Sequence, residues 1–131
     1  MNERRLLQTA VGLGCLVPIV GGGIGVFHGL AMLGTGTASA SADSHFRYLS
    51  GLLLGIGLGF LSTVPNIEAR SGRFRLLAAI VFLGGLGRLL SLVLTGAPAA
   101  SAFFALTMEL GVTPALAVWQ WRVARAARPG K

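Results

Sequence analysis

The chain has 131 residues, of which 53% are hydrophobic and only 11% are charged, and its formal net charge is +7. Soluble domains carry about 25% charged residues, so this composition indicates an integral membrane protein. Apolar segments occupy nearly the whole chain, which excludes a separate soluble catalytic domain. Any binding or catalytic site must therefore lie among the membrane helices or at their ends.

Four segments are long and apolar enough to cross a membrane, since a spanning helix needs about 20 mostly apolar residues. They are residues 6–33, 46–64, 76–95 and 99–121. The first segment is longer than the apolar region of a cleaved signal peptide, which has about 7 to 15 residues. The sequence therefore predicts an all-α fold, a four-transmembrane-helix bundle that forms a single domain over residues 1–131.

The basic residues predict how the helices are oriented. Nine of the eleven lie before the first segment, between the second and third, or after the fourth: Arg4, Arg5, Arg70, Arg73, Arg75, Arg122, Arg125, Arg128 and Lys131. The positive-inside rule then places both termini and the middle loop in the cytoplasm, and the loops at 35–44 and 96–98 outside. We expect a multi-pass protein of the bacterial inner membrane. Its basic ends would contact anionic membrane lipids rather than nucleic acid.

Glycines recur at every fourth position in two of the segments. Gly21, Gly25 and Gly29 form one series, and residues 51, 55 and 59 form the other. In lipid, close backbone approach through such small residues supplies the contacts that hold helices together. The two glycine ladders are therefore expected to pack helices within the chain, or to join copies of it into a homo-oligomer.

Two charged residues interrupt the apolar runs of the last two segments. Arg88 lies seven residues before Thr95, and Glu109 lies ten residues after Ala99. At about 1.5 Å of rise per residue, they are ~10 Å and ~15 Å below the outer ends of their helices. A charge at such depth is costly unless it is paired. The two side chains are expected either to form an ion pair that fixes helix register or to bind and process a ligand.

Further polar residues are predicted in the outer half of the bundle. His28 is near the outer end of the first segment, Asp43, His45, Arg47 and Ser50 are near the start of the second, and Ser91 follows Arg88 on one face of the third. If the helix faces meet, these residues line one outward-facing pocket of positive character, suited to an anionic or polar head group. The histidines have the simpler interpretations of an interfacial residue at 45 and a helix-bridging hydrogen-bonder at 28.

No metal or cofactor is expected. His28, His45 and Glu109 have suitable ligand atoms but no local spacing motif for a metal site. The chain also lacks a phosphate-binding loop, a nucleophile elbow and a haem-attachment motif.

One combination of residues resembles a known family. It comprises segment 43–48 (Asp-Ser-His-Phe-Arg-Tyr) leading into Gly51, the pair Gly87-Arg88 followed by Ser91 and Gly96, and the isolated Glu109. Together they resemble an uncharacterised bacterial family, a domain of unknown function found in small four-helix integral membrane proteins. The resemblance implies the fold and no activity. A remote similarity to DoxX-like membrane proteins rests on architecture alone.

Three functions remain open. The first is a protein whose polar pocket binds a lipid-like or anionic small molecule or a partner membrane protein. The second is a membrane-embedded enzyme acting on a lipophilic substrate, an isomerase, cyclase or hydratase. In it Glu109 is the acid or base, and Arg88 and Arg47 stabilise an oxyanion. The third is a transporter subunit, which the absence of polar residues in the predicted inner half disfavours.

Overall fold

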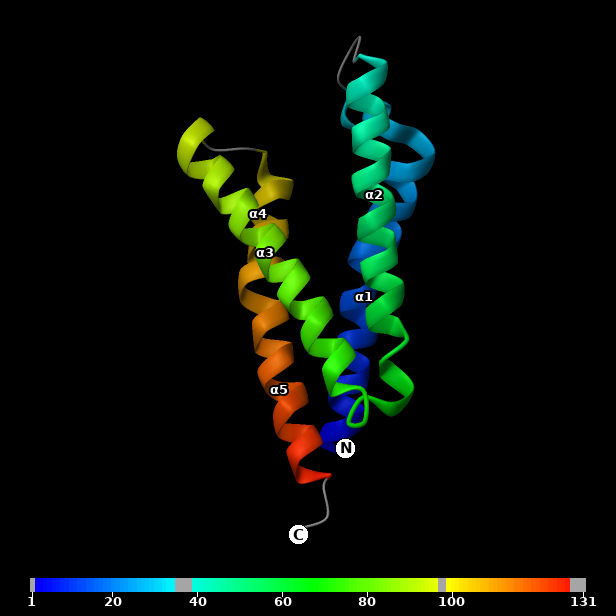
Figure 1. Cartoon of the computed structure of the whole chain (residues 1–131), viewed down its shortest axis with the longest axis vertical. Helices are drawn as coiled ribbons and strands as arrows, with labels where there is room; N and C mark the ends of the chain where they lie inside the picture. Colours follow the sequence, from blue (N-terminus) through cyan, green and yellow to red (C-terminus); the bar gives the residue numbers. More distant parts are fainter. Residues whose placement is uncertain (1, 35–38, 97–98, 128–131) are drawn as a thin grey trace. The chain divides into compact units, whose positions relative to one another are not determined.

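The computed structural model describes residues 2–34, 39–96 and 99–127, and this part of the chain is almost entirely helical (Figure 1). Helix α1 (Glu3–His28) continues into the short 3-10 helix η1 (Gly29–Leu33), and α2 (Ala40–Leu61) is followed by the 3-10 turn η2 (Val64–Asn66). After α3 (Ser71–Thr95), three helical pieces follow one another without a break: α4 (Ala100–Thr107), the π-helical segment η3 (Met108–Val112) and α5 (Thr113–Ala126).

In the part of the chain that the structure describes, four helical stretches are long and apolar enough to cross a membrane: Glu3–Leu33, Ala40–Asn66, Ser71–Thr95 and Ala100–Ala126. Each of them contains nearly all of one predicted span. The prediction of an all-α, four-helix, multi-pass membrane protein is therefore confirmed.

The second helix begins earlier than the apolar segment from which it was predicted. Ser39 occupies the N-cap position, and its side chain accepts a hydrogen bond from the backbone N–H of Ala42 at 3.2 Å. Such a cap satisfies a backbone donor that would otherwise lack a partner at the helix start. Residues 40–44, expected in an outer loop, are consequently the first turn of α2. The rest of that loop, 35–38, and positions 97–98 of the other outer loop lie outside the described residues.

Contacts divide the chain into two compact units. One consists of Met1–Leu7 with Asn66–Lys131, and the other of Gln8–Pro65. We call them the Arg88 unit and the Arg47 unit, and each is described by itself. The expectation of a single domain stays a prediction.

In the Arg47 unit, α1 packs against α2 through glycines. A Cβ atom on Gly22 would lie 2.6 Å from the backbone nitrogen of Leu54 and 2.7 Å from the carbonyl oxygen of Ser50, and a Cβ on Gly25 would overlap the Ser50 side chain. By contrast, a Cβ placed on Gly21 meets no described atom within 4 Å apart from its chain neighbours and the adjacent backbone of its own helix. Within the chain, Gly21 is therefore not on the packed face of α1, and a Cβ on Gly55 of the second ladder likewise meets no described atom outside its own helix turn within 4 Å. Gly22, Gly25 and Gly29 share the packed face, and Gly21 is turned away by about 100°. The pairing of chain copies through the glycine ladders stays a prediction.

In the Arg88 unit, α3 runs antiparallel to the continuous helical rod formed by α4, η3 and α5 (Figure 1). The buried residues of this unit include Phe74 and Ala78 on α3 and Val123 and Ala124 on α5. These small and aromatic side chains form the apolar part of its core.

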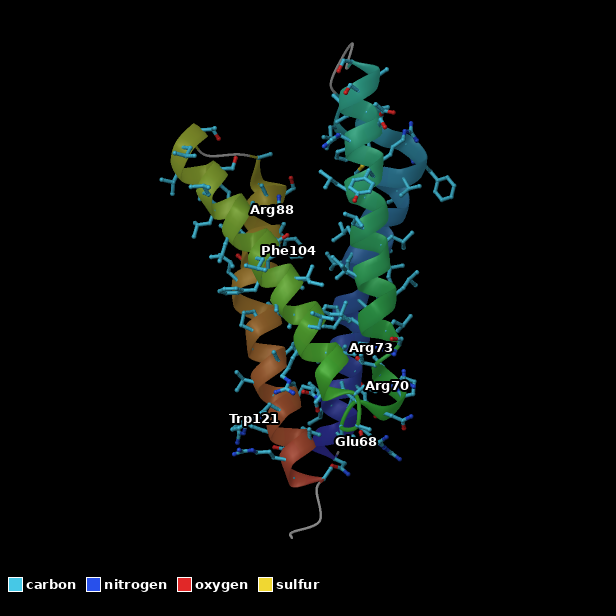
Figure 2. The ribbon with its side chains drawn as sticks, viewed as in Figure 1. Glu68, Arg70, Arg73, Arg88, Phe104 and Trp121 are labelled. Carbon is cyan, nitrogen blue, oxygen red and sulfur yellow. The ribbon has the colours of Figure 1, made fainter. Side chains whose placement is uncertain are left out.

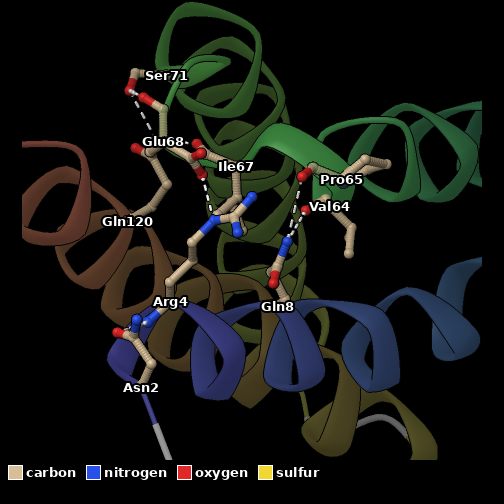
Figure 3. Close-up of polar contacts among 9 residues, drawn as sticks. All are labelled: Asn2, Arg4, Gln8, Val64, Pro65, Ile67, Glu68, Ser71 and Gln120. Atoms are coloured by element: carbon tan, nitrogen blue, oxygen red, sulfur yellow. Dashed lines mark hydrogen bonds and ion pairs between the residues drawn. The ribbon is translucent and has the colours of Figure 1, made fainter. Parts of the chain in front are cut away.

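A fully buried glutamine secures one end of the Arg88 unit. The side-chain nitrogen of Gln120 donates to the carbonyl oxygen of Ile67 and to the hydroxyl of Ser71, both at 2.8 Å (Figure 3). Its Oε1 has no hydrogen-bond partner among the residues described. Nearby, Arg4 donates from Nε to the carboxylate of Glu68 at 2.9 Å. The segment before α3 is thus held by both α5 and the start of α1.

Candidate functional site

The predicted site residues belong to two polar clusters, one in each unit. Arg88, Ser91 and Glu109 lie in the Arg88 unit. The other five, His28, Asp43, His45, Arg47 and Ser50, lie in the Arg47 unit. The prediction that all eight line one pocket concerns both units together and stays a prediction.

Arg88 and Glu109 form a two-pronged ion pair. The Nε atom of Arg88 donates to Oε2 of Glu109 at 2.9 Å, and its Nη2 donates to Oε1 at 3.0 Å. This fork geometry is the strongest arrangement available to an arginine and a carboxylate. The Arg88 side chain is nevertheless 41% exposed, whereas the Glu109 side chain is 18% exposed. The carboxylate is therefore the more enclosed partner, and the guanidinium keeps an accessible side.

A glycine on α3 makes this pairing sterically possible. A Cβ atom on Gly85 would lie 2.9 Å from Cβ of Glu109 and 2.7 Å from Cδ2 of Leu110. Real Cβ atoms do not approach that closely, so any larger residue would push the two helices apart. Gly85 therefore lets α3 approach the turn that carries Glu109. Sequence reasoning placed no weight on this residue, although its position three residues before Arg88 puts it on the same helix face.

Glu109 is carried by the π-helical segment η3, which sequence reasoning also missed. The backbone N–H of Thr113 bonds to the carbonyl of Met108, five residues earlier, and the Thr113 hydroxyl donates to the same oxygen at 2.9 Å. Pro114 has no N–H to offer to Leu110 in the usual α-helical pattern. The available signal was this Thr-Pro pair inside an apolar run. Single π-turns of this kind occur frequently at functional sites.

Ser91 lies one turn beyond Arg88 on α3. Its side-chain oxygen is 3.4 Å from that of Thr95, which itself donates to the Ser91 carbonyl at 2.7 Å. Both side chains are exposed. The face of α3 that follows Arg88 is thus polar and accessible up to the helix end.

In the Arg47 unit, Asp43 and Arg47 bind to each other and to backbone. The Nε atom of Arg47 donates to Oδ2 of Asp43 at 2.7 Å, and Nη1 donates to the carbonyls of Val26 at 2.6 Å and Phe27 at 3.0 Å. Oδ1 of Asp43 accepts the backbone N–H of Leu30 at 2.8 Å. The pair therefore satisfies backbone groups that the end of α1 leaves without helical partners.

The bend between α1 and η1 depends on Gly29. Its φ is +59°, and a Cβ atom there would overlap Oδ1 of Asp43 and lie 2.7 Å from Nη2 of Arg47. Only glycine adopts this conformation without strain. The geometry gives Asp43 and Arg47 a structural task, and their predicted part in ligand binding stays a prediction.

The two histidines and Ser50 are placed less centrally. Nδ1 of His28 is 3.3 Å from the carbonyl oxygen of Ile24 in its own helix, so this contact is not the bridge between helices that the sequence suggested. His45 is exposed. Ser50 is buried, and its hydroxyl donates to the Phe46 carbonyl at 2.8 Å. Ser50 thus serves the packing of α1 against α2.

Among the described residues, Arg88 has more guanidinium N–H donors without a hydrogen-bond partner than Arg47 has. A guanidinium has five N–H donors, and only two of those on Arg88 go to Glu109. Over residues 2–34, 39–96 and 99–127, no group of three histidine, cysteine or acidic side chains is placed to hold a metal ion. The arrangement at Arg88 can therefore bind a further oxygen acceptor.

Comparison with known proteins places the chain in a family. A family model described as "Domain of unknown function (DUF4345)" matches residues 6–120. No curated protein and no solved structure matches the chain. The matched range includes both polar clusters and most of all four spanning stretches, and it confirms the resemblance to an uncharacterised family, whereas the DoxX-like similarity stays a prediction. This small multi-pass membrane protein belongs to the DUF4345 family, a domain of unknown function.

Proposed function

We propose that the protein binds the anionic or carbonyl-bearing head group of a lipid-like molecule at Arg88. The proposal rests on the N–H groups of the Arg88 guanidinium that do not bind Glu109. Two donors hold Glu109 in a fork while 41% of the side chain stays exposed. The unused N–H groups suit a phosphate, carboxylate or carbonyl oxygen.

Glu109 has a positioning role in this proposal. Its carboxylate orients the guanidinium, as carboxylates commonly do for arginines in binding sites. It also neutralises the charge, which lowers the cost of holding Arg88 within an apolar span. A ligand that approaches the exposed side of Arg88 would then meet an oriented donor group, with the Ser91 and Thr95 hydroxyls further along the same helix.

The surroundings indicate an amphipathic ligand. Arg88 is flanked along α3 by exposed apolar side chains, including Leu86, Leu89 and Leu90. These would contact hydrocarbon chains while the guanidinium binds the head group. The site lies toward the Thr95 end of α3, away from the basic end of this unit where Trp121 is found (Figure 2).

The proposal includes a location. The basic distribution supports the bacterial inner membrane with both termini in the cytoplasm, and hence an Arg88 site in the outer leaflet. Labelling of single cysteines introduced near each terminus tests this orientation in cells. The native Cys15 is buried, which keeps its reactivity low.

The alternative function is acid–base catalysis on a lipophilic substrate. The observation favouring it is that Glu109 lies in a π-helical turn. In this reaction scheme the substrate oxygen replaces the carboxylate on Arg88, and the released Glu109 moves a proton. Binding of a ligand at Arg88 is therefore common to both functions.

Native mass spectrometry of the detergent-purified protein, combined with lipidomics, tests the proposal. Wild type is expected to retain a specific lipid-like molecule that Arg88→Gln loses. The exchange Arg88→Glu with Glu109→Arg rebuilds an ion pair with the cation on the other helix, so it is expected to fold and still lose the ligand. If the Glu109→Gln variant still binds the ligand but no longer converts it to a product, the enzymatic function is favoured. Equal lipid content in wild type and folded Arg88→Gln protein would overturn binding at Arg88.

A further inference from the structure

A hollow lined by basic residues lies at the end of the Arg88 unit away from Arg88. It encloses about 240 Å³ between the start of α3 and the end of α5, and it is lined by Ser71, Arg75, Trp121, Ala124 and Arg125. Two of its lining residues are arginines, and no acidic residue is among them. The hollow is therefore a cationic site formed by two helices.

The two arginines are available to a ligand. The guanidinium carbon of Arg125 lies 4.2 Å from the centre of the Trp121 ring, which orients the group without using its hydrogen-bond donors. Arg75 is exposed and lies one turn after Ser71 on α3. The nearest acidic residue in sequence, Glu68, is already paired with Arg4 at 2.9 Å. Among the described residues, neither Arg75 nor Arg125 forms an ion pair with a carboxylate, so these residues leave the positive charge of the hollow unneutralised.

The frame of the hollow is held by partly buried hydrogen bonds. The fully buried Gln120 side chain donates to the Ser71 hydroxyl at 2.8 Å. The Ser71 hydroxyl in turn donates to the backbone carbonyl of Glu68 at 3.3 Å. These bonds fix the start of α3 against α5. The separation between the helices that carry Arg75 and Arg125 is therefore set before any ligand binds.

We propose that this hollow binds the phosphate of an anionic phospholipid from the leaflet at the basic end of the unit. Two arginines on neighbouring helices match the oxygen geometry of a phosphate. A tryptophan beside basic residues marks the level of the lipid head groups, and basic pockets between membrane helices are typical binding sites for anionic head groups. A hollow below about 300 Å³ suits a head group rather than a larger soluble ligand.

This site is independent of the function proposed for Arg88. The two sites lie at opposite ends of the same unit and share no residue. Arg88 is paired with a carboxylate, whereas the hollow lined by Arg75 and Arg125 has no acidic lining residue. Loss of ligand at one site can therefore be measured while the other is intact.

The test is a titration of the full-length protein in detergent with phosphatidylglycerol and, separately, with phosphatidylcholine, followed by native mass spectrometry. Wild type is expected to prefer phosphatidylglycerol. Arg75→Gln and Arg125→Gln are each expected to weaken its binding about fivefold, which corresponds to about 1 kcal/mol per basic residue. The matched control is Arg122→Gln, which removes the same charge from an exposed neighbouring position outside the hollow.

Three outcomes would overturn the assignment. Equal weakening by Arg122→Gln would show diffuse attraction to the basic end instead of a site. Equal binding of the two lipids would exclude recognition of an anionic head group. Displacement of phosphatidylglycerol by excess inorganic phosphate would assign the hollow to a soluble anion, whereas retention of the lipid under that competition supports the proposal. Thermal unfolding of each variant confirms that binding is compared between folded proteins.

Discussion

The backbone of Gly85 lies directly against the side chain of Glu109, since a Cβ atom at position 85 would be 2.9 Å from Cβ of Glu109. This approach brings α3 close enough for Arg88 to reach both carboxylate oxygens, at 2.9 Å and 3.0 Å. Packing and the ion pair are therefore parts of one arrangement, and each can be tested through the other.

Replacement of Gly85 by alanine is expected to destabilise the protein by about 1 to 3 kcal/mol, the usual cost of an overpacked contact. The matched control is Gly84→Ala, because a Cβ at that position meets no described atom within 4 Å apart from its chain neighbours and the adjacent backbone of its own helix. Alanine also favours helix by up to about 1 kcal/mol over glycine, so Gly84→Ala should be neutral or stabilising. Thermal unfolding in detergent measures both. Similar behaviour of the two variants would contradict the close contact at Gly85.

Removal of one partner of the Arg88–Glu109 pair is expected to cost about 3 kcal/mol, the scale for an unpaired charge in the middle of a membrane helix. Arg88→Gln and Glu109→Gln should each show this loss, and the double variant should lose less than their sum because it leaves no lone charge. Equilibrium unfolding in mixed micelles provides the values for a double-mutant cycle. Additive losses would mean that the two groups do not interact in the membrane.

Adjacent glycines on α1 are expected to respond differently to the same change. Gly22→Ala should weaken the packing of α1 on α2, since the new Cβ meets backbone atoms of Leu54 and Ser50 at 2.6 Å and 2.7 Å, which cannot rotate away. Gly21→Ala meets no described atom within 4 Å and should leave the unfolding temperature unchanged or raise it. If instead Gly21→Ala is the harmful variant, the packed face of α1 is the one that the four-residue ladder predicted.

The stability of the Arg88 unit is expected to fall in acid through Glu68, which lies between the spanning stretches. A hydrogen bond from its own backbone N–H, followed by the contact with Arg4, holds the pKa of this carboxyl below its usual range despite partial burial. Because the folded-state pKa of Glu68 is lowered, its full stabilising contribution is present at pH values above its unfolded-state pKa of about 4.3. This contribution disappears as the pH falls through the folded-state pKa of Glu68. Both partners are partly exposed, so we expect no more than about 1 kcal/mol.

Comparison of wild type with Glu68→Gln checks this sign. The gap between their unfolding temperatures should be present at neutral pH and vanish below the folded-state pKa of Glu68. Arg4→Gln should keep part of the pH dependence, because the backbone hydrogen bond is the larger cause of the shift. A gap that widens in acid would refute the linkage.

Part of the candidate site was accessible to sequence reasoning. Arg88 and Glu109 stood out because each interrupts an apolar run, and their depths, ~10 Å and ~15 Å below the outer helix ends, are close enough for the two side chains to meet. Gly85 and the π-helical turn at Glu109 were missed because their importance comes from a neighbour that is remote in sequence: Gly85 matters only once Leu110 and Glu109 lie against it. Similarly, the sequence predicted Asp43 and Arg47 as pocket residues. Their hydrogen bonds to the backbone of Leu30, Val26 and Phe27 could not be predicted, because these bonds depend on where α1 bends.

The amino-acid sequence was sufficient to establish the class of protein, the four spanning helices and the concentration of basic residues at their ends. These follow from composition and segment length, because in lipid a backbone must satisfy its own hydrogen bonds and only long apolar helices do so. Helix packing was needed to show that Gly22 rather than Gly21 packs against α2, that Glu109 accepts two donors of Arg88, and that Arg75 and Arg125 line one hollow. Those outcomes depend on helix rotation and approach, which residues distant in the sequence set jointly.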